Sequence, residues 1–216
     1  YVAETGGSVT PGSESLAPAT GNAIGSVAIA DDGYVFTHWT NAIGENVGVD
    51  ETFIPRQNSV THIYEADTYT AHFAKRGDLN YQVEYYYDTV LGEVDSKDNV
   101  QFETEIPFTT TPRAFEGKNY IFESASGPKT VGSNSEANVV KVYYVLDEIG
   151  EENPENSDGI PDKYQVTFTY TSGNGGSVSG TVVEVHTIQQ ITRDSETNEI
   201  ITVGDVIPAH PRAEVT

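Results

Sequence analysis

Apolar and polar residues alternate over several short stretches, which are separated by Gly, Pro and acidic residues. The clearest stretches are residues 34–40, 67–74, 81–88, 139–145 and 164–170. Successive side chains of a strand point to opposite faces, so a period of two predicts a half-buried β-strand. Turn-forming residues such as Asp31-Asp32-Gly33 end these stretches. The pattern predicts a mainly β protein, with a β-rich α+β fold as the alternative.

The alternation stops twice, and these breaks predict a division into modules. The stronger break is an acidic stretch with Pro and Gly residues, 148–163, and the weaker one is the joint at 75–78. A chain of 216 residues has room for about three small domains. The predicted division is a first module at 1–76, a second at 79–147, an acidic linker at 148–163 and a partial third module at 164–216.

In each complete module, the alternating residues of the strands predict which side chains form the core. In the first, Tyr69, Ala71 and Phe73 fall on one side of a strand, and Trp39, the only tryptophan, is expected to anchor the core. In the second, one face carries Tyr81, Val83, Tyr85 and Tyr87. Further strands are predicted at residues 102–106 and 120–122.

The first module resembles a family of bacterial surface repeats. The residues that carry this resemblance are GGSV at 6–9, GSVAIADDGYVFTHW at 25–39, FIP at 53–55 and DTYTAHFA at 67–74. They look like the internalin B-repeat, a β-grasp-like module found in tandem on Gram-positive surface proteins. The resemblance covers about residues 5–75. It implies tandem small β-grasp-like modules in an elongated array.

The second module resembles the mucin-binding-protein type of surface repeat over about residues 79–147. This resemblance depends on the opening Tyr/Val strand, GKNY at 117–120 and VKVYYV at 140–145. It also implies a β-grasp-like fold, and mucin is a ligand of some relatives.

The third module begins like the first, because GGSV at 175–178 repeats GGSV at 6–9. Residues 206–208 and 213–216 then lead toward the equivalent of the strand at 27–30. The alignment predicts that the third module is cut in half, as in a window taken from a longer tandem array. We expect its exposed strand edges to fray or to pair with another chain.

Charge and composition exclude several classes of partner. The chain has 33 acidic and 11 basic residues, a formal charge of −22, so no basic stripe is available for nucleic acid or an anionic membrane. Cysteine and methionine are absent, which removes disulfides and thiol chemistry. The sequence shows no signal peptide and no apolar run of membrane-spanning length. We expect a fragment of an extracellular, cell-surface protein whose anchor lies outside it.

Few residues suggest catalysis. The histidines at 38, 62, 72, 186 and 210 are scattered, and none forms the paired spacing of a helical zinc site. Nucleophile-elbow, P-loop and dinucleotide-binding motifs are absent, and the glycines at 173–176 are interpreted as a hairpin turn. The sequence therefore predicts a protein that is not an enzyme.

One acidic cluster suggests a calcium site. Residues 156–162, NSDGIPD, resemble the calcium loop of thrombospondin-type repeats, in which carboxylates and amides converge on a hard cation. By this resemblance Asn156, Asp158 and Asp162 would supply side-chain oxygens, and Ile160 a carbonyl. Pro154 stands where a first Asp ligand is expected, so a plain hydrated turn remains the alternative.

The tyrosines suggest a second kind of site, because aromatic rings stack on sugar faces. Tyr85, Tyr87 and Tyr143 are the candidate ligand-binding residues, with a host glycan or mucin, or neighbouring surface repeats, as partners. Adjacent tyrosines in a strand point to opposite faces, so core packing is the competing interpretation. The predicted function is an adhesin stalk or spacer. The alternatives are a glycan- or mucin-binding module and an accessory region of an extracellular glycosidase.

Overall fold

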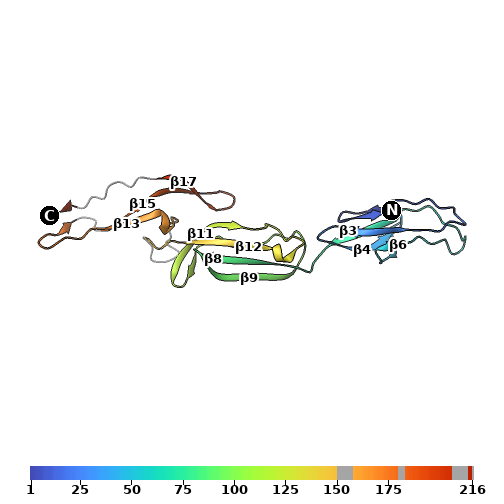
Figure 1. Cartoon of the computed structure of the whole chain (residues 1–216), viewed down its shortest axis with the longest axis horizontal. Helices are drawn as coiled ribbons and strands as arrows, with labels where there is room; N and C mark the ends of the chain where they lie inside the picture. The colour runs from blue at the N-terminus through green and yellow to red at the C-terminus, as the bar shows by residue number, and fades with distance from the viewer. Residues whose placement is uncertain (150–157, 180–182, 206–213, 216) are drawn as a thin grey trace. The chain divides into compact units, whose positions relative to one another are not determined.

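The computed structural model (Figure 1) describes residues 1–149, 158–179, 183–205 and 214–215. Within these ranges the regular structure is β-strand, with two short 3-10 helices, η1 (Ser135–Ala137) and η3 (Asp162–Tyr164), and no α-helix. Several separate sheets form tandem β modules. The prediction of a mainly β protein is confirmed.

The first module contains two sheets. One has the order β1 (Val2–Ala3), β7 (Thr70–Lys75), β4 (Tyr34–Thr40), β5 (Asn46–Gly48), and the other has the order β2 (Gly7–Thr10), β3 (Ser26–Ala30), β6 (Thr52–Phe53). The first and last strands, β1 and β7, are parallel neighbours. All other pairs in this module are antiparallel.

The core of the first module forms around Trp39, as predicted. Trp39 and Ala71 are fully buried and Ala28 nearly so, and the partly buried residues around them include Phe53, Tyr69 and Phe73. The indole N–H donates to the Asp50 carbonyl oxygen at 3.1 Å, which satisfies the one polar group of this large side chain.

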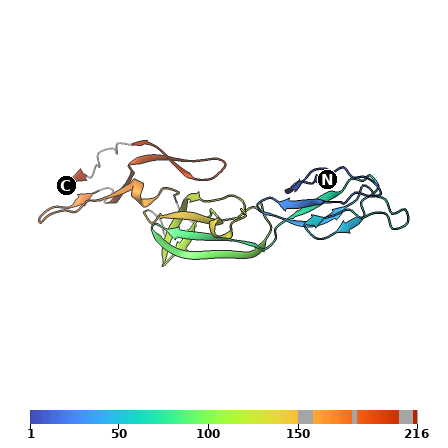
Figure 2. The same cartoon turned by 45° about the vertical axis from the view of Figure 1, so that its right-hand side comes forward.

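The second module is one mixed sheet, seen in Figure 2, with the order β10 (Arg113–Phe115), β11 (Lys118–Ser126), β12 (Val139–Leu146), β8 (Leu79–Tyr87), β9 (Val90–Val100). As in the first module, the strands that come first and last along the chain, here β8 and β12, are parallel neighbours in the sheet. Residues 79, 81, 83, 85 and 87 of β8 are buried and those between them are not, so the predicted face is confirmed.

The edge strands β9 and β10 of this sheet approach each other. Arg113 of β10 forms an ion pair with Glu93 of β9 at 2.9 Å. A Cβ atom at Gly92 would lie 2.8 Å from the ring of Phe115. The sheet therefore curls around its aromatic side chains.

The strand predicted at residues 102–106 is wrong. These residues form a turn, with a single bridge between Glu105 and Thr130. The physical reason is that Phe102 packs its ring edge-on against Tyr34 at 5.7 Å. Glu103 also has a positive φ of 65°, which an extended strand does not allow.

The third segment, residues 158–179, 183–205 and 214–215, forms three two-stranded antiparallel ladders. They are β13 (Gln165–Thr169) with β15 (Val183–Thr187), β16 (Gln189–Arg193) with β17 (Ile200–Asp205), and β14 (Val178–Ser179) with β18 (Glu214–Val215). Asn174 and Gly175 form a turn. The flanking strands β13 and β14 pair elsewhere, so the predicted hairpin between them is wrong.

The β14–β18 pair repeats a pairing of the first module. Val178 of the second GGSV pairs with Val215, as Val9 of the first GGSV pairs with Ala28. The predicted equivalence at residues 206–208 lies outside the described residues.

The chain packs as two compact units. The first comprises Tyr1–Tyr81, Lys97–Glu105 and Thr130–Asn138, and the second comprises Gln82–Ser96, Ile106–Lys129 and the described part of Val139–Thr216. The predicted domain boundaries stay predictions.

Candidate functional site

The described part of the acidic loop is held by its own hydrogen bonds. Asp158 accepts from the Ile160 N–H at 2.8 Å and, with its other oxygen, from the Gln165 side-chain amide at 2.6 Å. This arrangement is an Asx-type turn, in which a carboxylate stabilises the backbone two residues on. Gly159 supports the turn with a φ of 78°.

Asp162, near the end of the linker, accepts hydrogen bonds from residues at the start of the linker. It opens η3, and one carboxylate oxygen accepts from the backbone N–H groups of Glu148 and Ile149 at 2.7 and 2.9 Å. Within the described ranges, no group of three or more His, Asp or Glu residues is arranged to hold a metal ion. Asn156 lies outside those ranges, and the calcium site at Asn156, Asp158, Ile160 and Asp162 stays a prediction.

The structure does not bring the three candidate tyrosines together. Tyr85 and Tyr87 are buried, each with 3% of its surface exposed. The guanidinium of Arg113 covers the Tyr85 ring at 4.6 Å, and the Phe115 ring stacks on Tyr87 at 4.3 Å. Rings packed in this way offer no free face to a sugar.

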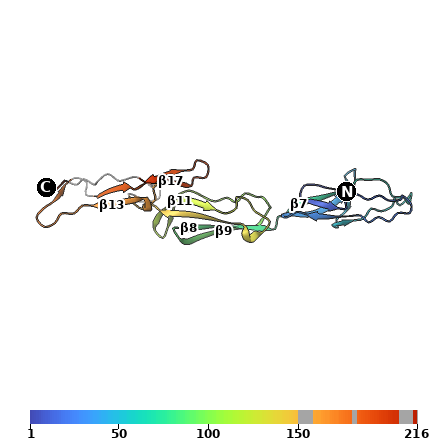
Figure 3. The same ribbon diagram turned by 45° about the horizontal axis from the view of Figure 1, so that its top comes forward.

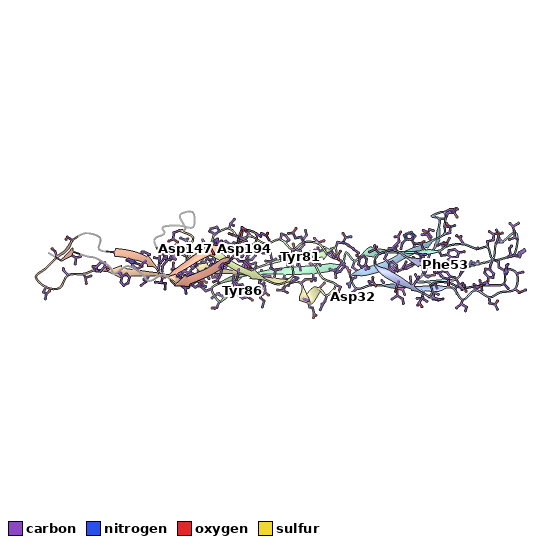
Figure 4. The ribbon with its side chains drawn as sticks, turned by 90° about the horizontal axis from the view of Figure 1, so that it is seen from above. Asp32, Phe53, Tyr81, Tyr86, Asp147 and Asp194 are labelled. Atoms are coloured by element: carbon purple, nitrogen blue, oxygen red, sulfur yellow. The ribbon has the colours of Figure 1, made fainter. Side chains whose placement is uncertain are left out.

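Tyr143 lies on the opposite face of the sheet and is half-buried. It stacks on Tyr86 of the neighbouring strand, with ring centroids 5.4 Å apart. The Tyr86 hydroxyl donates to Glu84 at 2.8 Å, and this bond raises the pKa of Tyr86. Figure 4 labels Tyr86 among the side chains of the second module. Of the three candidate tyrosines, Tyr143 therefore stays partly accessible, as does its partner Tyr86.

Two features that the sequence did not predict are packed joints. In the first, Lys75 pairs with Glu103 at 2.7 Å. The Arg76 N–H donates to the Gly33 carbonyl, and the Phe102 N–H donates to the Arg76 carbonyl, both at 2.8 Å. The short 75–78 joint therefore has defined partners on both of its sides.

The second packed joint lies on β11, beside β17 (Figure 3). The Arg193 guanidinium donates to the Phe122 carbonyl at 2.8 Å, and Glu199 accepts from the Ala125 N–H at 3.1 Å. Lys163 forms an ion pair with Glu123. Burial lowers the pKa of Arg193, against the opposing effect of the Asp147 charge. Most of these contacts reach backbone atoms, so no residue pattern could have revealed them.

A comparison with known families gives a match to the first module. Residues 1–77 match the family model described as Divergent InlB B-repeat domain. This is the repeat that the sequence resembled, and it is typical of bacterial surface proteins and usually a non-catalytic structural module. The second module has no identified family. Neither the curated proteins nor the solved structures contain a match to the chain.

The described residues contain no helix long and apolar enough to cross a membrane.

Proposed function

We propose that this chain is a non-enzymatic spacer in a bacterial cell-surface adhesin, where it carries other parts of the protein away from the wall. The observation that carries this proposal is the 75–78 joint. A flexible linker has few contacts of its own, whereas here an ion pair and two backbone hydrogen bonds hold Lys75 and Arg76 to Glu103, Gly33 and Phe102.

The charge of the chain supports the same proposal. A formal charge of −22 keeps a protein soluble and repels neighbouring copies and other acidic surfaces. The match to the InlB B-repeat domain supports a place at the bacterial surface. A calcium ion in the 156–162 loop would further stiffen the chain at the linker.

The test places the chain between a wall anchor and an epitope on a Gram-positive cell. A spacer predicts that antibody access to the epitope falls when residues 1–77 are deleted and returns when an unrelated domain of similar size replaces them. Equal access in all three strains would contradict the spacer proposal.

A second candidate function, glycan or mucin binding, is favoured by the half-buried Tyr86–Tyr143 pair. The Tyr143→Ala variant should then lose binding to immobilised mucin, while Tyr64→Ala, in the first module, should retain it. Absence of mucin binding by the parent chain at micromolar concentration would leave the spacer function alone.

A further inference from the structure

The second module is closed by a parallel ladder between its first and last strands. Six successive residue pairs join β8 to β12, from Gln82 with Val139 to Tyr87 with Tyr144. The Asp88 N–H continues the ladder by donating to the Tyr144 carbonyl at 2.8 Å. The chain enters the module at the start of β8 and leaves it at the end of β12.

This arrangement determines how a pulling force acts. Tension along the chain draws β8 toward its N-terminal end and β12 toward its C-terminal end. Because the two strands are parallel, they must slide past each other, and the evenly spaced hydrogen bonds of the ladder are loaded together. A pair pulled from one end would instead open one residue at a time. Forced unfolding is governed by the unfolding rate, so the shared load delays it.

Side chains reinforce the ladder on both faces of the sheet. On one face Tyr87 stacks on Tyr144 with ring centroids 5.7 Å apart. On the other face Tyr86 stacks on Tyr143 at 5.4 Å. Each ring pair joins β8 to β12, so sliding of the strands must break both stacks as well as the backbone bonds.

We propose that the second module is a force-bearing element, with the β8–β12 ladder as its mechanical clamp. This inference rests on the proposed spacer function, because a surface spacer transmits tension between what it binds and the cell. It gives the paired tyrosines 86 and 143 a mechanical role.

The first module has the same design in a shorter form. Its parallel pair, β1 with β7, has only two residue pairs, Val2 with Thr70 and Ala3 with Ala71. Two further backbone bonds flank them, from the N–H groups of Val2 and Glu4. The first module should therefore yield at a lower force than the second.

Single-molecule force spectroscopy of the whole chain tests the clamp by changing the direction of the load. In the first geometry, handles are attached at the two ends of the chain. In the second, the C-terminal handle is kept and the other is attached at Thr89→Cys, since the chain has no cysteine of its own. Thr89 is exposed in the turn after β8. Force then acts on the C-terminal ends of both β8 and β12, so the ladder peels.

In the first geometry we expect one step from each of the first two modules, with the second module yielding after the first. At 3.3–3.6 Å per residue, the first module should release about 250–280 Å of chain and the second about 230–250 Å. In the second geometry the first module is outside the force path and its step disappears. The unfolding force of the second module should fall to roughly half or less, because bonds break in succession. Equal force in both geometries, or a second module that yields before the first, would overturn the proposal.

A pair of variants tests the reinforcing side chains. Tyr143→Ala should lower the unfolding force of the second module in the first geometry, and Val94→Ala, on the exposed edge strand β9, should leave it unchanged. If Val94→Ala lowers the unfolding force and Tyr143→Ala leaves it unchanged, the proposal would also be overturned. The epitope-access test uses no force, so failure of the clamp and failure of the spacer function are distinguishable.

Discussion

Asn138 gives the sharpest test of how the second module is held together. Its side chain is 2% exposed and directly precedes β12. The amide oxygen accepts from the Gly132 N–H at 2.7 Å, and the amide nitrogen donates to the carbonyls of Asn80 and Gly132 at 3.1 and 3.0 Å. One buried amide thus joins the start of β8 to the start of β12.

The Asn138→Ala substitution removes all three hydrogen bonds. A buried polar group that loses its partner costs about 1–3 kcal/mol, and some of the three backbone groups will find water. We expect a loss of about 3 kcal/mol in the free energy of unfolding. For a domain of this size that corresponds to a fall in Tm of roughly 12–24 °C.

The matched control is Asn134→Ala, which removes the same side chain from an exposed site. Asn134 makes a single cap bond to the Glu136 N–H at 3.1 Å, so its loss should cost about 1 kcal/mol or less. Calorimetry, with Trp39 fluorescence as a separate signal for the first module, measures both variants. If the two variants melt alike, the bridging role assigned to Asn138 is wrong.

Three further predictions concern other parts of the chain. Trp39→Ala should lower the free energy of unfolding of the first module by about 3–5 kcal/mol, measured by chemical denaturation followed by circular dichroism. A loss no larger than that caused by substituting an exposed side chain would refute the anchoring role of Trp39. Burial raises the pKa of Tyr144 to about 12; since the unfolded phenol ionises near pH 10, the stability this group contributes is present below pH 10 and is lost as the pH rises toward 12. Tyrosinate absorbance should therefore rise late and together with unfolding, and Tyr144→Phe should weaken that alkaline transition. Gly33→Ala and Gly44→Ala impose similar strain, at φ values of 85° and 83°, but only at Gly33 would the new Cβ meet the Phe102 ring, at 2.6 Å; Gly33→Ala should thus speed hydrogen exchange at the Phe102 amide, whereas Gly44→Ala should not.

The strands and cores of the first two modules could be predicted because their signal is local. In β8 every second residue is buried, and this alternation is written directly in the sequence. Trp39 was recognisable as an anchor because a large apolar ring in a small module has few other places to go. These predictions needed no knowledge of which strands are neighbours.

The candidate tyrosine site shows where local pattern fails. Parity alone places Tyr85 and Tyr87 on one face of β8. It does not say which face of the sheet Tyr143 of β12 shares, because that depends on the register between strands distant in sequence. The register pairs Tyr143 with Tyr86, and the three candidates are thereby divided between a buried face and a partly open one.

The third segment binds to β11 where the pairing of β11 with its neighbouring strands is interrupted. No residue type in the sequence predicts this interruption. β10 pairs with β11 only as far as Tyr120, and the β11–β12 register shifts between Phe122 and Ser124. The edge beyond Tyr120 would leave backbone groups unpaired, which is costly where water is excluded. Arg193 and Glu199 supply the partners. The short edge strand β10 thus determines where the next segment attaches. The parallel β8–β12 ladder lies between β11 and β9, so its backbone groups are paired on both sides. It is therefore the part of the module best placed to carry load.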